Sequence, residues 1–503
     1  MESLFANLAL GFGVALSIQN LLYCFMGVVL GTLIGVLPGI GPVATIAMLL
    51  PVTFTLSPIS ALIMLAGIYY GAQYGGSTTA ILVNIPGESS AVVTCLDGYQ
   101  MARQGRAGAA LGIAAIGSFI AGTFATLVIA LFAPPLAEVA LKFGPAEYTS
   151  LMILGLIAAT VLAHGSLVKA IAMVLLGLLL GLVGTDVNSG VARFTFGISE
   201  LSDGIGFVGV AMGVFGFAEI ISNLEVKEGG TREVFVKKVS NLLPTLQDFK
   251  DCSGAIVRGT LLGSALGILP GGGALLASFA AYTLEKKLSW NSANFGKGAI
   301  QGVAAPESAN NAGAQTSFIP LLTLGIPSNP VMALMIGAMM IQGIAPGPQV
   351  MTERPQLFWG MIVSMWVGNL MLVILNLPMI GIWIKLLTVP YRILYPAILL
   401  FCCVGVYSIS NSPFDVMSTA IFGVVGYVFV KLECEPAPLI LGFILGPLME
   451  ENLRRAMLLS RGNPMTFVER PISAVMLAVA LFLLLITIAP AVRKTREVAF
   501  VEE

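Results

Sequence analysis

The chain has 503 residues, of which 57% are hydrophobic and 10% are charged. Soluble globular proteins carry roughly 25% charged residues, so this composition excludes a soluble protein and indicates a membrane protein. The formal net charge of -1 gives no reason to expect nucleic acid as a partner.

Apolar stretches in chain order predict the membrane segments. No basic residue precedes Arg103, so the N-terminus lacks the positive region of a cleaved signal peptide and is predicted to form the first segment. A spanning helix needs about 20 apolar residues, and we predict about 10 to 12 segments, several of them broken. The clearest stretches are residues 109–133, 151–182, 204–222, 357–384, 394–410 and 471–491.

A hydrophilic segment divides the chain in two. Residues 225–251 carry five basic residues, and basic loops favour the cytoplasm. The sequence therefore predicts a first transmembrane repeat at 1–223, a cytoplasmic linker at 224–254, a second repeat at 255–450, and a C-terminal loop and last helix at 451–503. The basic residues of the linker are Lys227, Arg232, Lys237, Lys238 and Lys250, and Arg493, Lys494 and Arg496 form a second basic cluster.

Matching motifs on the two sides of the linker indicate an internal duplication. GVLPGIGP at 35–42 matches GILPGGGA at 267–274, with Gly31 and Gly263 offset by 232 (263 minus 31). Ile85 of the NIPGES motif matches Ile326 of the GIPSNP motif at an offset of 241 residues (326 minus 85). Such repeats are typical of secondary transporters. The predicted fold class is an all-α polytopic membrane protein with two inverted repeats, broken helices and re-entrant hairpins.

The two Pro-Gly motifs predict helix breaks at membrane depth. Unpaired backbone groups survive there only where they are buried in protein or line a polar cavity. Free N–H groups suit an anion and free carbonyls suit a cation such as Na+. The predicted ion-binding residues are Pro38, Gly39, Gly41, Pro270, Gly271 and Gly273, together with Glu307.

Polar stretches near both breaks, at 69–91 and 305–330, predict a substrate site. Their hydroxyl and amide groups can donate to a carboxylate and also accept from a cation. Hydroxyls that bond their own helix carbonyls and amides that join helices are the alternatives, and Glu88 or Glu307 could instead lie at an interface. The predicted substrate-binding residues are Ser77, Thr78, Thr79, Asn84, Gly87, Glu88, Asn310, Asn311, Gln315, Thr316, Ser317, Ser328 and Asn329.

Other reactive residue types give no catalytic pattern. His164 is the single histidine and is interpreted as a loop or interface residue, and Arg103 and Arg106 as topology-setting charges. Six cysteines without C-x-x-C spacing are interpreted as small hydrophobic residues. Because we find no nucleophile, metal cluster or acid and base pair, an enzyme is not expected.

Several long motifs resemble one family. LPGIGP, YYGAQYGGSTTAILVNIPGE, APESANNA, LTLGIP, RFTFG at 193–197 and GFILGPLMEENLRRA at 442–456 resemble the large membrane subunit of bacterial tripartite tricarboxylate transporters. The resemblance implies a multi-pass permease of the bacterial cytoplasmic membrane that works with a small membrane subunit and a periplasmic solute-binding protein. The chain departs from the expected pattern at Ser328 and Asn329, where a glycine would follow LTLGIP.

The predicted site residues and the family resemblance together predict an ion-coupled importer of a di- or tricarboxylate, with elevator-like alternating access. Na+ is the expected coupling ion and H+ the alternative; no covalently bound cofactor is expected, and a homodimer remains open. An anion channel and a carrier independent of a binding protein are the alternative functions. A subunit that only anchors its partners is disfavoured, because the duplicated polar hairpins would then lack a purpose.

Overall fold

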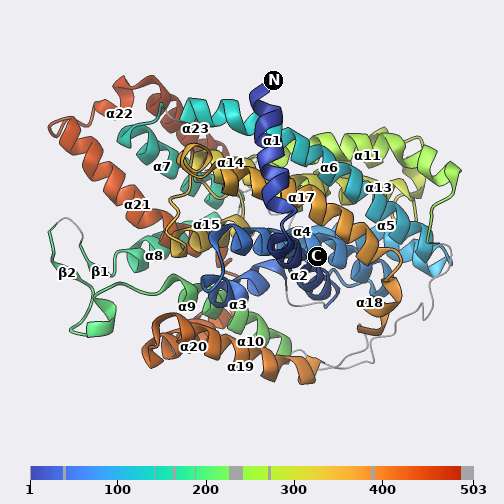
Figure 1. The fold of residues 1–503 in the computed structure, drawn as a ribbon, viewed down its shortest axis with the longest axis horizontal. Coiled ribbons are helices and arrows are strands. Elements are labelled where there is room, and N and C mark those ends of the chain that lie inside the picture. The colour runs from blue at the N-terminus through green and yellow to red at the C-terminus, as the bar shows by residue number, and fades with distance from the viewer. Residues whose placement is uncertain are drawn as a thin grey trace.

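The computed structural model describes residues 2–37, 41–140, 142–162, 166–186, 189–225, 242–269, 273–386 and 391–488. Within them the chain is almost entirely helical, apart from one antiparallel ribbon of β1 (Gly184–Thr185) and β2 (Ala192–Arg193). Figure 1 shows this ribbon projecting at the left end of the molecule, near α8 and α9. The all-α membrane class predicted from the composition is thereby confirmed.

The described part of the first half contains ten α-helices and the ribbon. Short 3-10 turns η1 (Ser89–Ala91) and η2 (Ser199–Leu201) and a π-helical turn η3 (Met212–Phe217) interrupt them. The helices are α1 (Glu2–Ala15), α2 (Ile18–Val36), α3 (Pro42–Phe54), α4 (Pro58–Val83), α5 (Val92–Arg103), α6 (Ala107–Ala140), α7 (Pro145–Leu162), α8 (Leu167–Gly181), α9 (Phe207–Ala211) and α10 (Ala218–Glu225).

The second half begins after the linker, most of which lies outside the described residues. A 3-10 turn η4 (Ser292–Asn294) precedes α13. The helices are α11 (Leu246–Gly267), α12 (Gly273–Leu288), α13 (Gln301–Thr316), α14 (Phe318–Leu324), α15 (Pro330–Ile341), α16 (Gln349–Glu353), α17 (Pro355–Asn376), α18 (Ile380–Leu386), α19 (Tyr391–Ser410), α20 (Pro413–Lys431), α21 (Ala437–Leu459), α22 (Thr466–Glu469) and α23 (Pro471–Ile488).

Five helical stretches among the described residues are long and apolar enough to cross a membrane: α2, α6, the continuous α9–η3–α10, α17 and α20. Two of the predicted apolar stretches each contain two helices. Residues 151–182 contain most of α7 and all of α8, and residues 357–384 contain most of α17 and part of α18. These stretches were predicted from their apolar content, which does not separate two consecutive apolar helices.

Glycines bring two helix pairs into the same close contact. On α2, a Cβ added at Gly27, Gly31 or Gly35 would overlap the α4 carbonyls of Met64, Ile68 and Ala72, respectively. On α11, a Cβ at Gly259, Gly263 or Gly267 would overlap the α13 carbonyls of Ala305, Ala309 and Gly313. Small residues at every fourth position let helix backbones approach in this way.

The offsets of these contacts agree with the offsets in sequence. Gly27 and Gly259 differ by 232 (259 minus 27), while their partners Met64 and Ala305 differ by 241 (305 minus 64). The Pro-Gly motifs and the Ile-Pro motifs showed the same two offsets. The corresponding segments of the two halves therefore make equivalent packing contacts.

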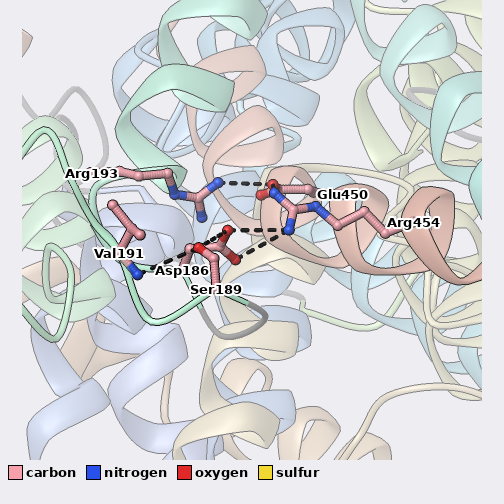
Figure 2. Close-up of polar contacts among 6 residues, drawn as sticks. All are labelled: Asp186, Ser189, Val191, Arg193, Glu450 and Arg454. Carbon is pink, nitrogen blue, oxygen red and sulfur yellow. Dashed lines mark hydrogen bonds and ion pairs between the residues drawn. The ribbon is translucent and has the colours of Figure 1, made fainter.

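The motif segments RFTFG and MEENLRRA meet in an ion-pair cluster (Figure 2). Arg193 of β2 binds the carboxylate of Glu450 at 2.8 Å, and Arg454 binds the same carboxylate at 2.6 Å. Arg454 also binds Asp186 beside β1 at 3.1 Å. The cluster therefore fastens the ribbon to α21.

Replacing Arg193 with alanine is expected to loosen the ribbon without unfolding the protein. The Arg193 side chain is partly exposed, and such ion pairs contribute about 1 kcal/mol or less. Hydrogen exchange measured over residues 184–198 should become faster while the melting temperature changes little. Arg455→Ala is the matched control, because Arg455 pairs only with Glu451 on its own helix; equal exchange in both variants would contradict the assigned role.

Candidate substrate-binding site

A cavity of about 540 Å³ lies beside the starts of α3 and α12 and beside two polar tips, the first at residues 84–89 (NIPGES) and the second at residues 325–330 (GIPSNP). Its lining comes from both halves of the chain. The residues are Gly41, Pro42, Val43, Ala44, Tyr69, Gln73, Pro86, Gly87, Glu88, Ser89, Val214, Phe215, Ala218, Glu219, Gly273, Ala274, Leu275, Asn329, Pro330, Val331, Val430, Glu435, Pro436 and Ala437.

Several helix starts line this cavity. The lining includes the starts of α3 at Gly41 and Pro42, α12 at Gly273, and α15 at Asn329 and Pro330. Ser89 starts the η1 turn that leads into α5. The first N–H groups of a helix have no partner within the helix, and they carry partial positive charge. Their convergence favours an anion.

The first tip is held by glycine packing and by a polar triad. A Cβ on Gly87 would overlap the carbonyl oxygen of Gly35 and lie 2.7 Å from the Cα of Gly76, so the tip fits directly against the end of α2. Beside it, the Ser90 hydroxyl contacts the Glu88 carboxylate and lies 2.7 Å from Oε1 of Gln73. The Glu88 carboxylate is thus fixed at the cavity wall.

The second tip is held by Asn329. Its Oδ1 accepts a hydrogen bond from the backbone N–H of Met332 at 3.0 Å, which caps α15. Its Nδ2 donates to the Ser317 hydroxyl at 3.0 Å and to the Tyr69 hydroxyl of α4 at 3.2 Å. Asn329 therefore joins the second tip to the first half of the chain.

The charged side chains that line the cavity are acidic. Glu88, Glu219 and Glu435 all contribute to the wall, and no lysine, arginine or histidine is among the described lining residues. The π-helical turn η3 places Val214 and Phe215 in the same wall. Turns of this kind occur often at functional sites, where they displace side chains from the regular helical position.

A second group of predicted residues lies in a separate buried network. Glu307 of α13 accepts hydrogen bonds from the hydroxyls of Ser77 and Thr94. The amide of Asn310 lies 3.5 Å from the same carboxylate. None of these four residues lines the 540 Å³ cavity.

The same network continues along α13 towards α6. Asn311 Nδ2 donates to Oγ of Ser118 at 2.8 Å, and the Thr126 hydroxyl bonds to the amide oxygen of Gln315. A small space of about 10 Å³, lined in part by Thr78, Ser77 and Ser118, lies beside it. Amide groups here join helices, as in the alternative considered from the sequence.

The remaining predicted residues have structural hydrogen bonds. Thr79 donates to the carbonyl of Val36 at 2.9 Å, which joins α4 to α2. The hydroxyls of Thr316 and Ser317 bond carbonyls one turn earlier in α13, and Ser328 donates to the carbonyl of Ser317 at 3.4 Å. Asn84 ends α4 in a left-handed conformation and is exposed.

Of the predicted ion-binding glycines, Gly41 and Gly273 line the cavity. Pro38, Gly39, Pro270, Gly271 and His164 lie outside the described residues. The predicted site thus separates into cavity residues, with Gly87, Glu88 and Asn329 among them, and a buried network centred on Glu307.

Several residues that line the cavity were not among the site residues predicted from the sequence. Tyr69 and Gln73 belong to the first polar stretch and lie one turn apart on α4, so helical spacing from Ser77 could have indicated them. Glu219 and Glu435 lie near the ends of apolar stretches and have no motif. Their approach to the tips depends on how α10 and α21 pack, which no local signal encodes.

Comparison with known proteins identifies the family. A family model described as "Tripartite tricarboxylate transporter TctA family" matches residues 21–441. The chain belongs to this family. The resemblance drawn from the motifs is thereby confirmed. As a TctA-family protein, the chain is a multi-pass membrane component of a tripartite tricarboxylate transporter, and family membership implies a small membrane subunit and a periplasmic binding protein as partners.

Two relatives of the TctA-family chain come from Agrobacterium vitis. The chain is 61% identical over 503 residues, all of both chains, to the "Uncharacterized 52.8 kDa protein in TAR-I ttuC' 3'region". It is 61% identical over 241 residues to the "Uncharacterized protein in TAR-II ttuC' 3'region", covering 48% of this chain and all of that one. No solved structure gives a significant match.

Proposed function

We propose that this chain is the permease subunit of an ion-coupled secondary importer in the bacterial inner membrane. Its substrate is a di- or tricarboxylate or a related organic anion delivered by the periplasmic binding protein. The single observation that carries the proposal is the cavity at which helix starts from both halves converge. Helix starts of this kind bind carboxylates in other transporters with discontinuous helices.

The acidic wall supports coupling to cations. An anionic substrate bound beside Glu88, Glu219 and Glu435 would be repelled unless a positive charge entered with it, and the described lining residues supply none. Cation entry therefore lowers the free energy of anion binding, which is the physical source of coupling. Na+ is the proposed coupling ion, bound in part by carbonyls near Gly41 and Gly273.

The equivalent packing of the two halves supports an inverted repeat. Transporters built from such repeats expose one site to each side of the membrane in turn. An elevator-like movement of the tips and breaks against the remaining helices is the proposed form of alternating access. This form rests on analogy with other carboxylate carriers that have broken helices.

Reconstitution with the two partner proteins tests the function directly. Uptake of a panel of labelled di- and tricarboxylates should saturate, require the binding protein and depend on a Na+ gradient. Uptake that does not saturate and does not respond to Na+ or H+ gradients would favour an anion channel. Saturable uptake without the binding protein would favour an independent carrier.

Replacing Asn329 with aspartate should weaken carboxylate binding while preserving the fold. Aspartate caps a helix as well as asparagine does, so α15 should still start at Pro330. The added negative charge faces the bound anion, and an increase in KM of roughly tenfold corresponds to about 1.4 kcal/mol. Uptake kinetics and the melting temperature are the two measurements; unchanged KM would place the substrate elsewhere.

A further inference from the structure

Glu307 is a fully buried carboxylate in a compartment distinct from the substrate cavity. The compartment is built from both halves of the chain, since Ser77 and Thr94 come from α4 and α5 and Glu307 from α13. No described residue forms an ion pair with Glu307. An ionised carboxylate buried without a partner is costly, so a group in this position either takes up a proton or is balanced by a cation.

Polar atoms without partners among the described residues lie beside this compartment, in a space that Ser77 lines but Glu307 and Thr94 do not. A space of about 10 Å³ lies beside Ser77 and is also lined by Tyr74, Ser118 and Asn376. The Tyr74 hydroxyl and the Asn376 Oδ1 are buried and have no hydrogen-bond partner among the described residues. This volume is just large enough for one water molecule. Buried polar atoms without partners indicate an unfilled coordination requirement.

The chemistry of these groups selects the occupant. The donor atoms are a carboxylate, hydroxyls and amide oxygens, and small hard cations prefer oxygen ligands of this kind. Asn311 adds a buried Oδ1 that has no partner, while its Nδ2 bonds Ser118 at the edge of the space.

We propose that Glu307, Ser77 and Thr94 form an enclosed Na+ site that is separate from the carboxylate cavity. The inference rests on the proposed ion coupling and adds the place where one coupling ion binds. Because the ligands come from both halves, an ion at this site holds α4 and α5 against α13. Ser77 lies one turn from Gln73, and Gln73 contacts the Ser90 and Glu88 tip. Filling the site therefore orders the first tip before the carboxylate binds.

Na+ binding to the purified full-length chain, without any carboxylate, tests this site. The melting temperature at fixed pH should rise with Na+ concentration when choline replaces Na+ at constant ionic strength. Glu307→Gln keeps the side-chain volume and should abolish the rise. Thr94→Val removes one ligand and should lower the apparent Na+ affinity by roughly tenfold or more, by comparison with supporting groups at metal sites.

The control is Thr323→Val, because Thr323 is also fully buried but its hydroxyl bonds only the Ile319 carbonyl. It should keep the wild-type response to Na+. A wild-type melting temperature that responds to pH but not to Na+, or a Na+ response that survives in Glu307→Gln, would overturn the site. Since no carboxylate is present, either result would leave the substrate cavity untouched, whereas unchanged kinetics in Asn329→Asp would leave the Na+ site untouched.

Discussion

Replacing Gly87 with alanine is expected to abolish carboxylate uptake. The added methyl group would overlap the carbonyl oxygen of Gly35 and the Cα of Gly76. These are backbone atoms, which cannot rotate away as a side chain could. Overpacking of this kind costs about 1–3 kcal/mol, and the tip must move to relieve it. Glu88 and the start of α5 would move with the tip, so binding should be lost before the protein unfolds.

The control for Gly87→Ala is Gly13→Ala on α1, because a Cβ there meets no atom within 4 Å. Alanine also favours the helix over glycine by about 1 kcal/mol, so this control should fold at least as well as the native chain. Uptake by reconstituted protein is the measurement. Normal uptake by Gly87→Ala would show that the tip does not need its contact with α2.

Replacing Asp97 with alanine is expected to give the largest loss of stability. The buried Asp97 carboxylate accepts hydrogen bonds from the backbone N–H groups of Gly296, Gly298 and Ala299 at 2.8 to 2.9 Å and from the Tyr282 hydroxyl at 2.9 Å. Each buried donor left without a partner costs about 1–3 kcal/mol, so the total should exceed about 3 kcal/mol. Thermal unfolding in detergent or nanodiscs measures the effect.

The matched variant is Asp97→Asn. Its amide oxygen can still accept the three backbone N–H groups, so the loss should be clearly smaller than in Asp97→Ala. Gly296 and Gly298 have φ angles of +81° and +101°, which the loop needs in order to direct its N–H groups at one oxygen. Equal stability of Asp97→Ala and the native chain would show that this loop tolerates unpaired amides.

The sequence predicted the membrane class and the helical fold because composition and long apolar stretches indicate both, whereas the internal repeat stays a prediction. Composition gives the class, and the offsets of 232 and 241 recur in the glycine contacts of α2 and α11. Helix interruptions inside apolar stretches were not predicted. The separation of α7 from α8 was among them, although the sequence between these helices carries His164, Gly165 and Ser166.

The sequence also predicted which polar stretches meet, but it could not predict which side of a helix each residue faces. Asn329 and Glu88 line the cavity, whereas Thr79 bonds the Val36 carbonyl. Since α4 is buried on all sides, its hydrophobic pattern has no polar face that would mark the substrate side. Glu219 enters the cavity wall only through the packing of α10.

The buried acidic residues Glu88 and Glu307 have different proposed roles. Glu88 faces the cavity, where its charge must be balanced when an anion enters. Glu307 is buried between the halves, where a proton or a cation would have to neutralise its charge. One coupling ion in each compartment would let cations enter both before and with the substrate.

Equilibrium binding of a labelled carboxylate to the purified chain in nanodiscs tests whether an anion and its coupling cation occupy the protein together. Linkage requires that each raises the affinity for the other by the same factor. We expect the carboxylate to bind tightly to the native chain in Na+, weakly to it in choline, and weakly to Asn329→Asp in either medium. Equal affinity in Na+ and choline, with full binding by Asn329→Asp, would contradict this joint occupancy.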